Sequence, residues 1–109
     1  MKLIIAIVQD EDTSRLVSSL MSEGFGVTKL ATTGGFLRAG NTTLLVGVED
    51  DKYDAAMAVI EKVCKSRKQV ATSPSPMAGG TGVYVPYPIE VMVGGATVFV
   101  MNVEKFVKM

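Results

Sequence analysis

The pattern of hydrophobic and polar residues predicts an alternation of strands and helices along the first part of the chain. Residues 3–8, Leu-Ile-Ile-Ala-Ile-Val, form a short, β-branched run that is apolar throughout, which is typical of a strand. After a polar stretch, apolar residues recur at helical spacing from Leu16 to Met21, and Gly24 follows as a helix stop. We therefore expect a strand followed by a helix over about residues 12–23.

The same pattern repeats further along the chain. We expect strands over residues 25–32 and 42–49, the first with Val27 and Lys29 on one face and Thr28 and Leu30 on the other. Asp50-Asp51 then precedes a second helix. The apolar stripe of this helix consists of Tyr53, Ala56, Met57, Ile60, Val63 and Cys64.

The composition changes in residues 68–88, which contain all 4 prolines of the chain, Pro74, Pro76, Pro86 and Pro88. Proline removes a backbone donor, so we expect a long loop here with only short extended pieces. Structureless loops of more than about 12–15 residues are uncommon in compact domains and are usually functional. Two extended runs, 89–93 and 96–103, flank Gly94-Gly95 and predict a late hairpin.

This order of elements predicts one α+β domain over residues 1–109. The architecture expected is a ferredoxin-like split β-α-β sandwich: an antiparallel sheet, two helices on one face, and an extra C-terminal hairpin. The other face of the sheet then needs a cover, and its candidate residues are Val27, Leu45, Val98 and Val100. We expect self-association to bury this face.

Composition excludes several classes of function. The 11 basic and 11 acidic side chains give a formal net charge of zero, which argues against a general nucleic-acid binder. The longest apolar run, residues 3–8, is far shorter than the roughly 20 residues that a membrane span needs, so no membrane segment is expected. A chain with 1 cysteine and no histidine cannot form an internal disulfide or a His-based triad. We therefore expect a cytoplasmic protein with no catalytic residues and no metal site.

Candidate binding chemistry lies between two of the expected strands. Gly34-Gly35 allows close approach of backbone amides, Phe36 offers a ring for stacking on a purine, and Asn41 offers both a donor and an acceptor to a base edge. A plain hairpin loop, with Phe36 exposed or buried against a neighbouring subunit, explains the same residues.

Other features also permit two interpretations. Gly47 interrupts a strand, which indicates close approach of a ligand or of another backbone, a bulge, or a crowded helix crossing. The acids near residues 10–12 and 49–54 resemble metal ligands, but both groups lie at helix starts, so helix capping is favoured. Residues 84–88, Tyr-Val-Pro-Tyr-Pro, are compatible with a pocket wall, a partner surface, or a rigid return into the sheet. We expect Cys64 to be a small buried hydrophobic residue.

Several of these stretches together resemble the PII-like cyclic di-AMP receptor proteins of Gram-positive bacteria. The resemblance is carried by residues 28–37 (Thr-Lys-Leu-Ala-Thr-Thr-Gly-Gly-Phe-Leu), 40–43 (Gly-Asn-Thr-Thr), 84–88, and 93–100 (Val-Gly-Gly-Ala-Thr-Val-Phe-Val). It extends from Met1 to about Phe106, nearly the whole chain.

The resemblance implies a non-enzymatic homotrimer that binds one cyclic di-AMP in each cleft between subunits. The 32–42 segment corresponds to a short T-loop and the 68–88 segment to a long B-loop. In classical PII proteins those loops contact protein partners, and the partner here is unknown. The ligand-binding residues implied are Thr28, Gly35, Phe36, Leu37, Asn41, Gly47, Gly94 and Gly95.

One position departs from the family pattern. The family usually has Asn-Phe-Arg before the Thr-Lys-Leu block, with the arginine on a phosphate, whereas this chain has Gly24-Phe25-Gly26. A charge-assisted contact is worth about 1.5–3 kcal/mol, so its loss would weaken binding about ten- to hundredfold unless Lys29 or Arg38 replaces it. The alternative function is therefore a trimeric adaptor with weakened or different nucleotide specificity, such as ATP.

Overall fold

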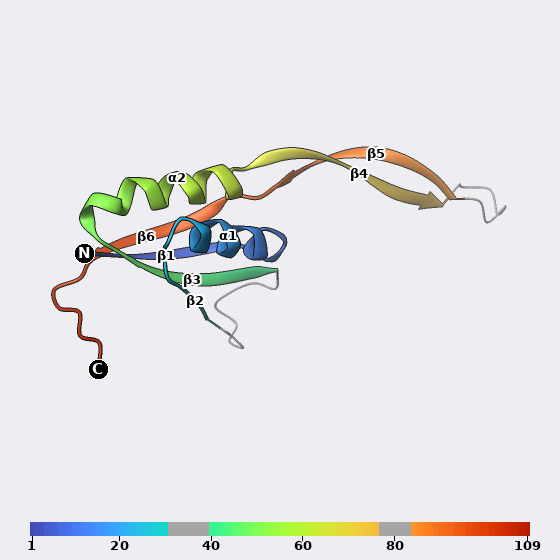
Figure 1. Ribbon diagram of the computed structural model, residues 1–109. Helices are drawn as coiled ribbons and strands as arrows, with labels where there is room; N and C mark the ends of the chain where they lie inside the picture. Colours follow the sequence, from blue (N-terminus) through green and yellow to red (C-terminus); the bar gives the residue numbers. More distant parts are fainter. Residues whose placement is uncertain (31–39, 77–83) are drawn as a thin grey trace.

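The computed structural model describes residues 1–30, 40–76 and 84–109 (Figure 1). Its elements in chain order are β1 (Lys2–Gln9), α1 (Asp10–Ser22), β2 (Val27–Leu30), β3 (Asn41–Val48), the 3-10 turn η1 (Asp50–Lys52), α2 (Tyr53–Cys64), β4 (Arg67–Pro76), β5 (Tyr84–Val93) and β6 (Ala96–Asn102). The predicted strands and helices up to Cys64 are therefore confirmed, with ends shifted by a few residues.

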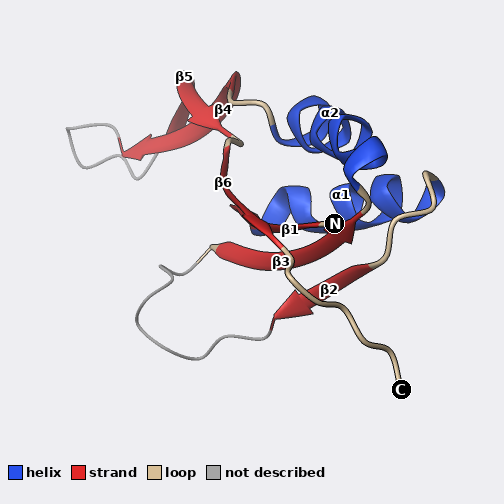
Figure 2. Ribbon diagram, turned by 90° about the vertical axis from the view of Figure 1, so that its left-hand side faces the viewer, coloured by secondary structure: helices blue, strands red, loops and turns tan. Residues whose placement is uncertain are grey.

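The main sheet is antiparallel, with the strand order β2-β3-β1-β6, and both helices lie on one of its faces (Figure 2). This arrangement confirms the predicted α+β, ferredoxin-like sandwich. The core lies between sheet and helices. It contains Ile4, Ala6, Val8, Leu44, Val46 and Val48 from the strands, and Leu16, Leu20, Ala56, Ile60, Val63 and Cys64 from the helices. The predicted stripe of α2 is buried or half-buried throughout.

No described helix or strand covers the other face of the sheet, which we call the outer face. Register places alternate residues of β1, β2, β3 and β6 on it. Its apolar members are all partly or largely exposed: Leu3, Ile5, Ile7, Leu30, Leu45, Phe99 and Met101. The sequence assignment of this face was right for Leu45 and wrong for Val27, Val98 and Val100. Those three valines lie in register with Val46, Ala6 and Ile4, so they face the helices.

Most of the 68–88 segment is a long two-stranded ribbon rather than the irregular loop expected from its prolines. β4 and β5 pair from Arg67↔Val93 to Pro76↔Tyr84 and project away from the sheet (Figure 1). All four prolines fall in the alternating pairs Thr72↔Pro88, Pro74↔Pro86 and Pro76↔Tyr84. Because proline has no N–H, these must be the pairs that exchange no hydrogen bonds. The ladder therefore loses no bond to proline.

The further hairpin expected near the C-terminus is present, but different strands form it. β5 pairs with β4 in the ribbon, whereas β6 pairs with β1 in the main sheet. Gly94-Gly95 is therefore a corner between two sheets, not the turn of a hairpin. Both glycines have positive φ, 81° and 91°, which the change in direction requires.

Candidate functional site

Thr28 and Gly47 lie on the outer face at neighbouring strands. Thr28 of β2 is paired with Leu45 of β3, and both Thr28 and Gly47 are exposed. Continuing the same register by one step places Gly26 opposite Gly47, on the same face as Thr28. The position of the missing arginine and two predicted ligand contacts thus form one patch.

Gly47 is part of a regular strand. The β1–β3 register runs without interruption from Lys2↔Val48 to Gln9↔Asn41, which excludes a bulge at this glycine. Gly47 pairs with Leu3 on the outer face, so it does not face a helix. No described atom lies within 4 Å of a Cβ built at Gly47 or at Gly26. Of the interpretations considered, close approach of a ligand or of a second backbone is therefore the one that remains.

Asn41 lies at the opposite end of β3. It is half-buried and pairs with Gln9, the last residue of β1. With a rise of about 3.3 Å per residue, Asn41 is about 20 Å along the strand from Gly47 and about 13 Å from the level of Thr28. One chain by itself therefore does not gather these three residues around a single base.

Gly94 and Gly95 are in hydrogen-bonded positions near this Asn41 end of the sheet. The Gly94 N–H donates to Gln9 Oε1 at 2.7 Å, and the Gly95 N–H donates to the carbonyl of Cys64. A Cβ at Gly94 would lie 2.5 Å from Arg67 Nη1 and 2.9 Å from the carbonyl oxygen of Lys65. These amides are thus already used within the chain, and the glycines are required for the corner itself.

Three predicted ligand contacts, Gly35, Phe36 and Leu37, lie outside the described residues, as does Arg38. Lys29, the other proposed substitute for the missing arginine, pairs with Leu44 on the helix side of the sheet. It therefore faces away from the patch that contains Gly26, Thr28 and Gly47, and it does not replace an arginine at position 26 in this structure.

The acidic start of α1 has a role that the sequence did not reveal. Gln9 is the N-cap and makes no side-chain capping bond. Asp12, only 1% exposed, instead accepts from Arg67 Nη2 at 2.9 Å and from Arg15 Nη2 at 3.2 Å. The hydrogen bond to Asp12 raises the pKa of the Arg67 guanidinium above its ordinary value. Asp12 lies in the first turn of α1, as predicted, but its carboxylate pairs with two arginines and anchors the first residue of β4 to α1.

The described part of the chain contains a buried thiol and no cluster of metal-ligating side chains. No group of three or more Cys, Asp or Glu side chains there is placed to hold a metal ion. Cys64 is buried, as predicted, and burial raises the pKa of its thiol to about 11, so it is a poor nucleophile at neutral pH. None of the described helices is both long and apolar enough to cross a membrane.

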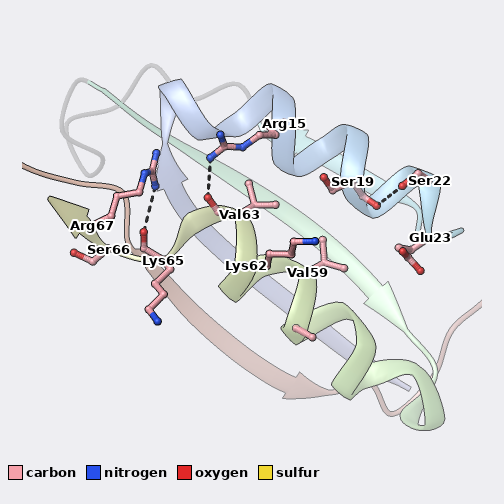
Figure 3. Close-up of a pocket in the computed structure, with 11 residues that line it drawn as sticks. Arg15, Ser19, Ser22, Glu23, Val59, Lys62, Val63, Lys65, Ser66 and Arg67 are labelled. Carbon is pink, nitrogen blue, oxygen red and sulfur yellow. Dashed lines mark hydrogen bonds between the residues drawn. The ribbon is translucent and has the colours of Figure 1, made fainter. Parts of the chain in front are cut away.

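A groove of about 850 Å³ separates α1 and α2 on the helical side of the molecule (Figure 3). Arg15 crosses it and donates to the carbonyl of Val63 at 3.0 Å. Of the predicted ligand residues that the structure describes, none lines this groove. This groove is therefore not where the sequence places the ligand.

Comparisons with known proteins agree with the fold. The sequence model of a family described as "Cyclic-di-AMP receptor" matches residues 1–109. Among solved structures, the chain is similar to the crystal structure of a functionally unknown protein from Pediococcus pentosaceus ATCC 25745. The two are 39% identical over 99% of this chain and 96% of that chain, with a TM-score of 0.78.

Proposed function

The chain belongs to the cyclic di-AMP receptor family, and on this premise we propose that it is a non-enzymatic, cytoplasmic signalling protein that binds cyclic di-AMP between the subunits of a homotrimer. Its loops would then relay the occupied state to a protein partner. The observation that carries the proposal is the family match over the whole chain, because it includes every candidate residue.

The outer face supports assembly into an oligomer. It presents Phe99 at 55% and Met101 at 52% exposure, next to half-buried isoleucines of β1. A contiguous apolar sheet face of this kind is typical of a surface that becomes buried by association. Packing three such faces together would cover it.

The spread of the candidate residues supports a site shared between subunits. Thr28 and Gly47 lie at one end of β3 and Asn41 at the other. A neighbouring copy can bring its own residues opposite either end, which a single chain cannot do. At such a seam Thr28 and Asn41 would bond the base edges and the bare backbone at Gly47 would accommodate a ring. By family resemblance, Gly35, Phe36 and Leu37 would pack on the base.

Gly26 favours a second candidate function. Without an arginine on the patch, and with Lys29 on the other side of the sheet, the phosphate half of recognition is weaker than in the family pattern. A trimeric adaptor that binds its partner regardless of cyclic di-AMP, or that prefers ATP, fits this departure. Competition between ATP and cyclic di-AMP on the same protein separates these alternatives.

Calorimetric titration with cyclic di-AMP tests the main proposal, combined with light scattering to establish the oligomeric state. We expect saturable binding of one nucleotide per subunit. Gly47→Ala and Gly47→Val should weaken binding progressively, about 5- to 100-fold for the valine, because each fills space next to the base. Absence of heat at high micromolar ligand with a folded trimer would refute nucleotide sensing.

A further inference from the structure

The corner where β1 ends and α1 begins, residues 9–12, is hydrogen-bonded to two other segments of the chain. One is the start of β3, and the other is the root of the β4–β5 ribbon, at Arg67 and Gly94. On one side, the Asp10 N–H donates to the carbonyl of Gly40 at 2.8 Å, and Thr42 Oγ1 donates to Asp10 Oδ1. Both bonds fix the chain where it enters β3. Asp10 therefore attaches Gly40 and the start of β3 to this corner.

The same corner is also hydrogen-bonded to the root of the β4–β5 ribbon. Gln9 accepts from the Gly94 N–H just after β5, and Asp12 accepts from Arg67 at the start of β4. Among the described elements, β4 and β5 pack extensively only against each other. These contacts at the root, together with the bond from Gly95 to Cys64, therefore fix the direction in which the ribbon projects.

Gln9 is where the two sides meet. Its backbone is paired with Asn41, a proposed base contact, while its side chain holds Gly94. We propose that Gln9 is a positioning residue that fastens the root of the β4–β5 ribbon to the Asn41 end of the sheet and thereby couples nucleotide binding to the ribbon. The coupling rests on the proposed function, whereas the fastening is a property of the chain without ligand.

The experiment compares Gln9→Leu, which removes the acceptor at similar size, with Gln9→Glu, which keeps an acceptor oxygen. Gln69→Leu is the matched control, because Gln69 is exposed on β4. Hydrogen exchange of the Gly94 amide by NMR measures the fastening in the ligand-free protein. Calorimetry with cyclic di-AMP, on variants checked for unchanged oligomeric state and melting temperature, measures the coupling.

We expect Gln9→Leu to speed exchange of the Gly94 amide at least tenfold and to weaken cyclic di-AMP binding about two- to tenfold, the range of a lost neutral hydrogen bond. Gln9→Glu and Gln69→Leu should match the unaltered protein within twofold. Unchanged Gly94 exchange in Gln9→Leu overturns the fastening, and unchanged affinity with faster exchange overturns the coupling. If the unaltered protein binds no cyclic di-AMP, the proposed function fails and the coupling with it, while the exchange data still decide the fastening.

Discussion

Restoring a cation at position 26 is the sharpest test of how this chain recognises its ligand. Gly26 precedes β2, and register continued from Val27↔Val46 places it beside Gly47 on the outer face. Its φ is not positive, and no described atom lies within 4 Å of a Cβ added there. Gly26→Arg should therefore leave the fold of the single chain intact and extend a guanidinium across the ligand patch.

The expected gain follows from two opposing contributions. A charge-assisted hydrogen bond to a phosphate contributes about 1.5–3 kcal/mol. Immobilising a long side chain costs about 0.5–1.5 kcal/mol. With both contributions at the middle of their ranges the net gain is about 1 kcal/mol, so the dissociation constant for cyclic di-AMP should fall about 5- to 10-fold.

Calorimetry on Gly26→Arg and Gly26→Gln measures this gain. The glutamine variant has the same loss of backbone freedom and a polar but shorter side chain without charge, so it should stay within about twofold of the unaltered protein. Ser18→Arg, on the exposed side of α1, controls for a general increase in charge. Raising the salt concentration should reduce the advantage of the arginine variant. Equal affinities for the arginine and glutamine variants would refute a phosphate contact at this position.

Three further predictions concern assembly and stability. Phe99→Glu places a charge on the outer face and should convert the proposed trimer to folded monomers, as measured by light scattering and circular dichroism; a trimer that persists in this variant would contradict burial of this face. Asp12→Asn leaves the Arg15 and Arg67 guanidinium groups without their shared carboxylate and should lower the free energy of unfolding by about 1–3 kcal/mol in urea titrations, with Asp51→Asn, at an exposed acid, as the neutral control. Cys64 has a pKa raised from its ordinary value of 9.0 to about 11, so its contribution of about 2–3 kcal/mol is fully present below pH 9 and is lost as the pH rises toward 11. Cys64→Ala should remove that part of the alkaline loss, and an unchanged pH profile would argue against a buried neutral thiol.

Local patterns predicted the core elements because burial imposes its period on neighbouring residues. The stripe from Tyr53 to Cys64 and the run at residues 3–8 each identify their own element without reference to the rest of the chain. The face of a strand is a different matter, since it depends on which strand lies beside it. Val98 and Val100 were therefore placed on the wrong side, although both were correctly predicted to be in a strand.

Features that depend on distant pairing were beyond the sequence. Asp12 and Arg67 are 55 positions apart, and nothing local distinguishes a paired acid from a capping one. The ribbon did leave a signal in the sequence, because the prolines at 74, 76, 86 and 88 all occupy even-numbered positions. Alternate residues of an antiparallel pair exchange no hydrogen bonds, so this spacing is compatible with two paired strands. The high proline content nevertheless favoured a loop. For the site, the juxtaposition of Gly26, Thr28 and Gly47 needed the register, and Gln9 carried no chemical signal at all.

The parity of the prolines has a consequence for how the ribbon meets other molecules. The ribbon is a two-stranded sheet with no further strand paired to either margin among the described residues, and at each proline the margin has no N–H to offer to an incoming strand. Two ribbons are thus hindered from joining into a wider sheet, which protects a protruding β-structure against fibrous aggregation. A partner that recognises the ribbon must consequently contact its side chains, because the prolines interrupt the addition of a strand along its main chain.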